Sequence, residues 1–272
     1  MNNKLKIKIG VIGVGHLGNF HLEQLSRLKN VSCVGFFDVS KDKANQATQK
    51  FNLKSYKTIS SICEDADAII ISTPTSSHYD VALQGLEHNC HLFIEKPITE
   101  TVEQAKDLLE KSHNKIIQVG HIENFNPAFC SLKDQKLEPQ FIESHRLSTY
   151  NSRGMDVTVV SDLMIHDIDL ANFFLKSSMK SVQSRNSNVL HNSNDISSAL
   201  LTFANSTTAS LYANRVAKDP MRQFELYGDN EVFTLDLNRK IIHHTKFIPK
   251  HDLLRPTTKQ VDTKEEDALE NE

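Results

Sequence analysis

Apolar and polar positions divide the chain into two parts that differ in their periodicity. Up to about residue 120, five short apolar runs alternate with longer stretches in which apolar residues recur every three or four positions. The apolar runs are LKIKIGVIG, VSCVGFFD, DADAIIIST, CHLFIE and KIIQVG, and the stretches between them include HLGNFHLEQLSRLK and TETVEQAKDLLEKS. This alternation predicts strands connected by helices, and therefore a parallel sheet.

The pattern changes after about Pro127. One helical segment follows Ser161, and after it come runs of alternating apolar and polar residues separated by turn residues. These runs are SVQSRNSNVL, ISSALLTF, TTASLYANR, RQFELYG, EVFTLDL and KIIHH. They predict an antiparallel sheet, so we expect an α/β protein with domains at residues 1–122 and 123–272. The final TKEEDALENE predicts the charged beginning of a helix that stops before an apolar face has formed.

Composition and charge narrow the class of protein. The 272 residues are 39% hydrophobic, enough for a sizeable core, and their formal net charge is −3. No strong basic field exists to hold nucleic acid or an anionic membrane. The four cysteines lack the spacing of a zinc ribbon, and no apolar stretch is long enough for a signal peptide or a membrane span. We therefore expect a soluble, cytoplasmic protein.

A glycine-rich loop between the first predicted strand and the first predicted helix is the candidate cofactor site. Gly13, Gly15 and Gly18 form a G-x-G-x-x-G motif, and Asp38 ends the next predicted strand. In this context the glycines allow a tight turn, close approach of a pyrophosphate, and close packing of helix on strand. A plain structural turn is the alternative, but four of the nine glycines lie between Gly10 and Gly18. Asp38 can bind ribose hydroxyls and would repel a 2′-phosphate, which favours NAD over NADP.

Two further motifs follow predicted strands at the carboxyl edge of the sheet, where open α/β sheets bind ligands. STPTSSHYDVA contains Thr73, Pro74 and His78, and IEKPIT contains Glu95 and Lys96. A third motif, VGHIENFNPAF, lies where the first predicted domain hands over to the second. Alone, an E-K-P sequence is usually a strand end with a solvated lysine, so these motifs gain meaning only together.

The segment SDLMIHDIDL places three polar residues on one side of a predicted helix. At 100° per residue, Asp162, His166 and Asp169 fall within about 60° of one another. An acid and an imidazole one turn apart fit a proton-transfer pair, a metal site or a satisfied polar stripe. No second cluster of ligands completes a metal shell, so we expect no metal.

Together, these motifs resemble those of the glucose–fructose oxidoreductase / inositol dehydrogenase (Gfo/Idh/MocA) family of NAD(P)-dependent sugar and cyclitol dehydrogenases. The five motifs G-x-G-x-x-G, T-P-x-x-x-H, E-K-P, G-x-x-x-x-F-N-P and D-x-x-x-H occur in family order over nearly the whole chain. The resemblance implies an N-terminal Rossmann domain and a C-terminal α+β domain with a large open, mostly antiparallel sheet. It implies NAD as the cofactor, bound by Gly13, Gly15, His16, Leu17, Gly18, Asp38, Thr73, Pro74, His78 and Glu95.

The resemblance also implies that Lys96, Asp162 and His166 are catalytic, and their chemistry agrees. A histidine can take the hydroxyl proton of a secondary alcohol at neutral pH. Asp162 would orient its ring and stabilise the imidazolium, while Lys96 would place a positive charge beside the developing alkoxide. Because Lys96 precedes Pro97, that peptide bond can be cis at modest cost. We therefore expect the lysine of the first domain and the histidine of the second to meet at one substrate carbon.

The strings DVTVVSDLMIHDIDL, VGHIENFNPA and HRLSTYNSRGMD resemble the nucleotide-sugar branch of the family. This implies oxidation of the 3-hydroxyl of UDP-N-acetylglucosamine to a 3-keto sugar, which a transaminase consumes in lipid A biosynthesis. We expect Arg146 or Arg153 near the diphosphate and His121 in the substrate site. Two alternatives stay open: a cyclitol or free-sugar dehydrogenase, and a non-catalytic protein that binds NAD or a sugar nucleotide.

Several positions depart from the family pattern. Met164 stands where most members have glycine, Asn124 where this branch has arginine, and Ser206 where glycine is expected at a hairpin turn. The sequence also stops where complete members continue into a closing C-terminal helix. The uncovered face of a large sheet predicts self-association, as a homodimer or homotetramer.

Overall fold

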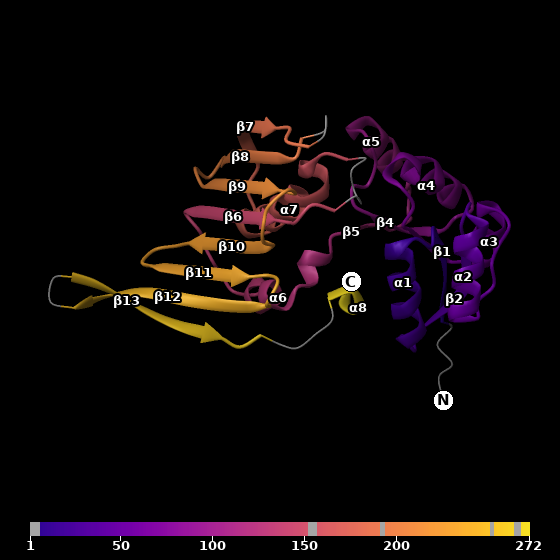
Figure 1. Cartoon of the computed structure of the whole chain (residues 1–272), viewed down its shortest axis with the longest axis horizontal. Helices are drawn as coiled ribbons and strands as arrows, with labels where there is room; N and C mark the ends of the chain where they lie inside the picture. The colour runs from indigo at the N-terminus through magenta and orange to yellow at the C-terminus, as the bar shows by residue number, and fades with distance from the viewer. Residues whose placement is uncertain (1–5, 152–156, 191–193, 251–252, 264–267) are drawn as a thin grey trace. The chain divides into compact units, whose positions relative to one another are not determined.

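The computed structural model of the chain describes residues 6–151, 157–190, 194–250, 253–263 and 268–272 (Figure 1). Backbone contacts group the chain into two compact units, Met1–Gly120 and His121–Glu272. Among the described residues, no helix is long and apolar enough to cross a membrane.

The first unit contains a parallel sheet of five strands in the order β2-β1-β3-β4-β5. The strands are β1 (Ile7–Ile12), β2 (Val31–Phe37), β3 (Ala68–Ile71), β4 (His91–Glu95) and β5 (Ile117–Gly120). Each corresponds to one of the five predicted apolar runs. Because β1 pairs with both β2 and β3, the chain changes direction across the sheet at β1, which is where open α/β sheets bind ligands.

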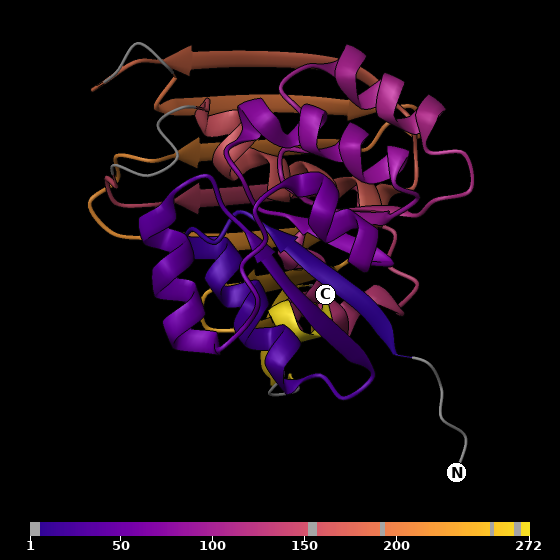
Figure 2. The ribbon, with the colours of Figure 1, turned by 90° about the vertical axis from the view of Figure 1, so that its right-hand side faces the viewer.

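Helices cover both faces of this sheet (Figure 2). On one face, α1 (His16–Arg27) and α2 (Lys41–Phe51) pack on Val11 and Ile70. On the other, α3 (Ile59–Asp65), α4 (His78–Glu87) and α5 (Val102–Lys111) enclose a second apolar cluster with Ile12 and Ile69. The alternation of residues in β1 and β3 between two cores explains why these strands are apolar at successive positions.

The second unit contains a sheet of eight strands in the order β13-β12-β11-β10-β6-β9-β8-β7. All its neighbouring strands are antiparallel except β6 and β9, which are parallel. The strands are β6 (Phe141–Leu147), β7 (Met179–Ser187), β8 (Ile196–Phe203), β9 (Thr208–Asn214), β10 (Met221–Tyr227), β11 (Glu231–Asp236), β12 (Ile241–Lys250) and β13 (Leu253–Val261). The α/β class and the mostly antiparallel second sheet are confirmed, but β6 and β13 were not predicted.

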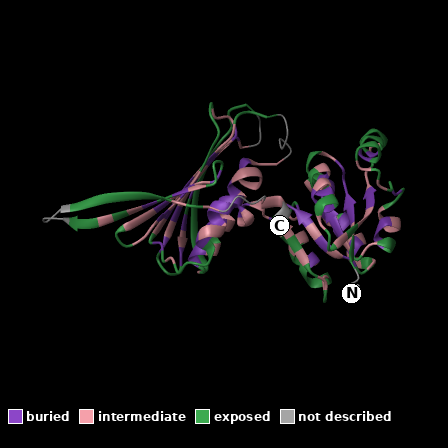
Figure 3. Ribbon diagram, turned by 90° about the horizontal axis from the view of Figure 1, so that it is seen from below, coloured by how far each residue is buried: buried purple, intermediate pink, exposed green. Residues whose placement is uncertain are grey.

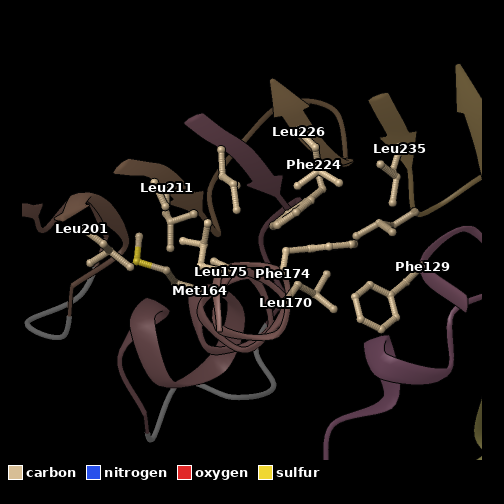
Figure 4. Packing of buried hydrophobic residues seen from close by; sticks show 14 of the residues in the cluster. Phe129, Met164, Leu170, Phe174, Leu175, Leu201, Leu211, Phe224, Leu226 and Leu235 are labelled. Atoms are coloured by element: carbon tan, nitrogen blue, oxygen red, sulfur yellow. The ribbon is translucent and has the colours of Figure 1, made fainter. Parts of the chain in front are cut away.

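One face of this sheet carries the core of the second unit. In Figure 4, Leu170, Phe174 and Leu175 of α7 (Ile165–Leu175) point toward strand residues that include Leu211 and Phe224. The helix α6 (Pro127–Lys133) adds Phe129 to the same cluster. Pairing in register places apolar residues of neighbouring strands side by side on this face, for example Phe224 opposite Leu235.

The opposite face and both edges of the sheet are much more exposed (Figure 3). Every residue of the edge strand β7 is exposed, and Val182 and Leu200 are exposed apolar side chains on β7 and β8. At the hairpin between β8 and β9, Ser206 has a φ of 69°, the left-handed conformation that favours glycine. The backbone at Ser206 therefore has the left-handed conformation that made glycine the expected residue.

The predicted helix after Ser161 is not regular along its length. A π-helix spans Val160–Met164, and α7 begins only at Ile165. The estimate that Asp162 lies within about 60° of His166 assumed 100° per residue, and the wider π turn removes that basis. At the end of the chain, α8 (Ala268–Asn271) is a single short turn.

Candidate active site

The loop from β1 to α1 has the geometry of a dinucleotide-binding turn. Gly13 has a φ of 88°, and a Cβ there would lie 2.9 Å from the carbonyl oxygen of Ser72. A Cβ on Gly18 would overlap the carbonyl oxygen of Gly13, so α1 packs directly on the loop. A Cβ on Gly15, by contrast, would meet nothing within 4 Å. The space over Gly15 is the room that a pyrophosphate at the N-terminus of α1 requires.

Asp38 is fixed beside this loop. Its carboxylate accepts hydrogen bonds from the backbone N–H of Val14 at 2.8 Å and of Ser40 at 2.7 Å. Each oxygen keeps further acceptor capacity, so the carboxylate fits the hydroxyls of a ribose. A hollow of about 380 Å³ opens next to the loop, lined by Val14, Gly15, His16, Asn19, Phe20, Glu23, Lys43, Gln46 and Lys50.

The remaining predicted loop residues also lie on the accessible side of α1. The ring of His16 lines the hollow and packs edge-on against Phe20, with the ring centroids 4.9 Å apart. Leu17 is 44% exposed. The ring of His16 is therefore available to a ligand over the loop, whereas Leu17 is not among the residues that line the hollow.

Two buried imidazoles hold the turn that follows β4. Glu95 ends the strand, and its Oε1 lies 2.7 Å from Nε2 of His21 on α1, with both residues buried. The peptide bond between Lys96 and Pro97 is cis, as the sequence allowed. His78, the first residue of α4, contacts the backbone oxygen of Pro97 from the other side.

The segment after β3 lies against the same turn. Nε2 of His78 is 2.8 Å from the carbonyl oxygen of Thr73, and Nδ1 is 2.9 Å from that of Pro97. His78 was predicted to bind the cofactor, but both its nitrogens face the protein backbone and the residue is 1% exposed. The Oγ1 atom of Thr73 is buried and has no hydrogen-bond partner among the described residues, so it suits a ligand. Pro74 next to it is exposed.

In the second unit, a group of polar residues surrounds His166. The rings of His121 and His166 are perpendicular, with centroids 6.3 Å apart. Asp169 lies one turn after His166, and its Oδ2 accepts a hydrogen bond from Asn124 at 2.6 Å and lies 3.8 Å from Nδ1 of His121. The structure therefore brings the predicted substrate residue His121 to the predicted base His166. Asp162 is half-buried in the π-helix one turn earlier.

Arg146 does not have the surroundings of a substrate-binding residue, and that prediction is corrected. It is 2% exposed; its Nε and Nη2 donate to Asp167 at 2.9 and 2.8 Å, and its Nη1 donates to Glu123 at 2.8 Å. Burial lowers the pKa of this guanidinium, but the two carboxylates outweigh burial and raise it overall. Burial also raises the pKa of Asp167, against the opposing effect of Arg146. Arg153 lies outside the described residues.

Sequence reasoning missed the two carboxylates of this network. Glu123 and Asp167 flank the predicted site residues His121 and His166 in sequence, and both are buried. The sequence could have revealed them, because an acidic residue that is buried within an apolar segment needs a cationic partner. Among the described residues, no group of three or more His, Cys, Asp or Glu side chains is placed to hold a metal ion.

Comparison with protein families matches the two units separately. Residues 7–121 match an oxidoreductase family with an NAD-binding Rossmann fold, and residues 119–234 match the GFO/IDH/MocA C-terminal domain. These two matches cover most of the chain.

Individual relatives and solved structures agree. The chain is 29% identical to UDP-N-acetylglucosamine 3-dehydrogenase of Acidithiobacillus ferrooxidans over 88% of this chain and 77% of that protein. The solved structure of that enzyme has a TM-score of 0.91, with 98% of this chain and 86% of that chain covered. The chain is also 29% identical to scyllo-inositol 2-dehydrogenase (NAD(+)) of Bacillus subtilis, over 65% of this chain and 56% of that protein. A scyllo-inositol dehydrogenase from Lactobacillus casei shares the fold, with a TM-score of 0.75 at 21% identity over 85% of this chain and 76% of that chain.

Proposed function

We propose, from the premise that this chain belongs to the GFO/IDH/MocA family of oxidoreductases, that it oxidises a secondary hydroxyl of a sugar nucleotide with NAD. The specific proposal is oxidation of the 3-hydroxyl of UDP-N-acetylglucosamine to the 3-keto sugar. The observation that carries it is the likeness to UDP-N-acetylglucosamine 3-dehydrogenase, which extends over both units.

The first unit offers the groups that NAD requires. The amides at the start of α1 and the open space over Gly15 suit the pyrophosphate, and the carboxylate of Asp38 suits the ribose. The Asp38 carboxylate would repel a 2′-phosphate, so we propose NAD rather than NADP. When bound, the nicotinamide supplies the acceptor for the substrate hydride.

The second unit offers the proton acceptor. His166 takes the proton from the hydroxyl oxygen as hydride leaves the carbon that bears this hydroxyl, and the carboxylate of Asp162 stabilises the resulting imidazolium. Lys96 stabilises the negative charge that develops on the substrate oxygen. His121, beside the ring of His166, contacts the substrate.

Incubation of the pure protein with NAD and UDP-N-acetylglucosamine tests the proposal, with and without a transaminase and its amino donor. We expect formation of NADH and of a 3-keto sugar, detected by absorbance and mass spectrometry. With the transaminase we expect more NADH, because the keto sugar is removed by conversion to an amino sugar. His166→Ala should abolish turnover and retain NAD binding. Absence of NADH and of keto sugar under both conditions would overturn the proposal.

A cyclitol dehydrogenase is the second candidate, because the scyllo-inositol 2-dehydrogenase of Bacillus subtilis is equally identical over a shorter span. A free cyclitol has no diphosphate, so Arg153→Ala should leave its oxidation unchanged, whereas it should raise KM for a UDP-sugar. Parallel assays with scyllo-inositol and UDP-N-acetylglucosamine distinguish the two candidates. A protein that only binds these ligands would bind NAD without turnover in either assay.

The proposal has consequences for the cell. A transaminase would consume the 3-keto product, as in the synthesis of a diamino sugar for lipid A, and the reaction would take place in the cytoplasm. The exposed apolar residues on the open sheet face, among them Leu200 and Met221, suit a homodimer or homotetramer. Sedimentation analysis of the pure protein decides its oligomeric state.

A further inference from the structure

The protonation state of His78 follows from its two neighbours. Nδ1 lies 2.9 Å from the carbonyl oxygen of Pro97, and Nε2 lies 2.8 Å from the carbonyl oxygen of Thr73. A carbonyl oxygen only accepts hydrogen bonds, so each contact needs a proton on the histidine nitrogen. A neutral ring has one N–H group, and its other nitrogen would direct a lone pair at an oxygen. Rotating the ring by 180° would only exchange these nitrogens for carbon atoms.

Two effects oppose a positive charge at this position. The residue is 1% exposed, and it is the first residue of α4, where the helix dipole disfavours a cation. Acting in the other direction, hydrogen bonds from a charged donor are about twice as strong as neutral ones, and His78 makes two. Asp80 in the same first turn of α4 also favours a cation. In the neighbouring turn, Glu95 is engaged by His21, and Lys96 is the other charged residue.

We propose that His78 is held as an imidazolium and is a positioning residue for the turn that carries Lys96. By donating to Thr73 and Pro97 together, it ties the segment after β3 to the turn after β4. These segments carry the Thr73 hydroxyl, assigned to the cofactor, and the Lys96 ammonium, assigned to the substrate oxygen. The catalytic consequence rests on the proposed function, whereas the protonation state of His78 does not.

Nitrogen NMR of the full-length protein labelled with ¹⁵N-histidine tests the protonation state. The signals of His78 are assigned by their loss in His78→Gln, and we expect both ring nitrogens to carry a proton at pH 7. The matched control is His88→Gln at the other end of α4, where Nε2 lies 2.8 Å from Oγ of Ser60. That variant should leave the His78 signals unchanged. A ring nitrogen of His78 without a proton would overturn the imidazolium.

Hydrogen exchange and kinetics test the positioning role. Both donors of glutamine are on a single nitrogen, which cannot replace two separate ring nitrogens. His78→Gln should therefore speed amide exchange at Lys96 and Ile98 by about tenfold, while His88→Gln should not. We expect kcat of His78→Gln to fall by about tenfold or more, with the dissociation constant of NAD changed by less than about twofold. Unchanged exchange and unchanged kcat would overturn the role. An inactive wild-type protein would instead count against the proposed function, and the NMR and exchange results would still decide on His78.

Discussion

At the scale of single residues, the G-x-G-x-x-G motif between β1 and α1 requires glycine for two different reasons, one for protein packing and one for ligand binding. Gly18 serves the packing of the protein, because a side chain there would overlap the carbonyl oxygen of Gly13. Gly15 serves the ligand, because the space over it is open. The same residue type is therefore required at the two positions for different reasons, which substitution can distinguish.

Alanine at these two positions should affect different properties, protein stability at Gly18 and NAD affinity at Gly15. Gly18→Ala should lower the free energy of unfolding by at least about 3 kcal/mol, because backbone atoms must move. Gly15→Ala should change stability by less than about 1 kcal/mol, but should weaken NAD binding by at least about tenfold, because the Cβ occupies the pyrophosphate side of the loop. Urea unfolding and calorimetric titration measure the two quantities. Normal NAD affinity in Gly15→Ala would contradict this assignment of the loop.

The local geometry of the loop was predictable from nearby sequence, whereas the surroundings of Arg146 were not. The positions of Gly13, Gly18 and Asp38 follow from their spacing along a strand, a turn and the next strand, so the motif alone predicted the loop geometry. The partners of Arg146 are 23 and 21 residues away and come from different elements. An arginine in an alternating strand has the same pattern whether it faces solvent, a diphosphate or two buried carboxylates.

At the scale of elements, Arg146 joins three segments of the second unit, among them those that carry or adjoin His121 and His166. It lies on β6, Glu123 lies on the short helix η2 (Ile122–Phe125), and Asp167 lies on α7. The buried pairs therefore fix η2 and α7, which carry or adjoin His121 and His166, against one strand. Buried ion pairs of this kind hold elements in a defined arrangement more reliably than they raise the free energy of unfolding, because the cost of desolvating the charges offsets much of their attraction.

Removing Arg146 should be costly, because it would leave two carboxylates buried without their main cation. We expect Arg146→Met to lower the free energy of unfolding by about 3–5 kcal/mol. The matched control is Arg222→Met on β10, directly opposite Arg146 in the sheet and also paired with Glu123. The Arg222 side chain is 48% exposed, so its loss should cost less than about 1 kcal/mol. Equal losses in urea unfolding of the two variants would contradict the buried network.

A second tie between elements should depend on pH. Asp107 on α5 accepts hydrogen bonds from Lys111 and from the hydroxyl of Tyr79 on α4, and both hold the pKa of Asp107 below its usual 3.8. A lowered pKa in the folded state means that the stabilisation is present above about pH 4 and is lost as pH falls through the lowered value. Asp107→Asn should therefore lower Tm at pH 7, and the difference from wild type should shrink below pH 3.8. The exposed Glu110→Gln on the same helix should not lower Tm at pH 7.

The two strands that the sequence did not reveal were hidden for different physical reasons. In β6, the buried face consists of Ile142, Ser144 and Arg146, so polar residues occupy inward positions and obscure the alternation. In β13, the residues of an edge strand are mostly exposed and include Pro256, so there is no apolar face to detect. Contacts with distant residues stabilise β6 as a strand, and pairing at the edge of the sheet stabilises β13. Neither strand follows from the local pattern of apolar residues.

At the scale of the whole molecule, the two units have separate apolar cores and separate shares of the proposed chemistry. The first unit has one core on each face of its parallel sheet and contains the loop, Asp38, Thr73 and Lys96. The second unit has one large core under α7 and contains His121 and His166. Since the groups assigned to NAD all lie in the first unit, binding of NAD should be separable from the substrate chemistry of the second unit.

NAD should therefore stabilise the molecule in a way that hydrogen exchange can localise. At a free concentration of 100 times its dissociation constant, a ligand of the native state adds about 2.7 kcal/mol to the free energy of unfolding. We expect slower amide exchange over residues 13–19 with NAD, and unchanged local exchange in β9 and β10. At the same NAD concentration, tenfold weaker binding should reduce the stabilisation of Gly15→Ala to about 1.4 kcal/mol, whereas Arg222→Met, in the other unit, should retain the full effect. Protection that appeared in the strands of the second unit but not in the loop would contradict a cofactor site built by the first unit, because a bound pyrophosphate must cover the amides at the start of α1.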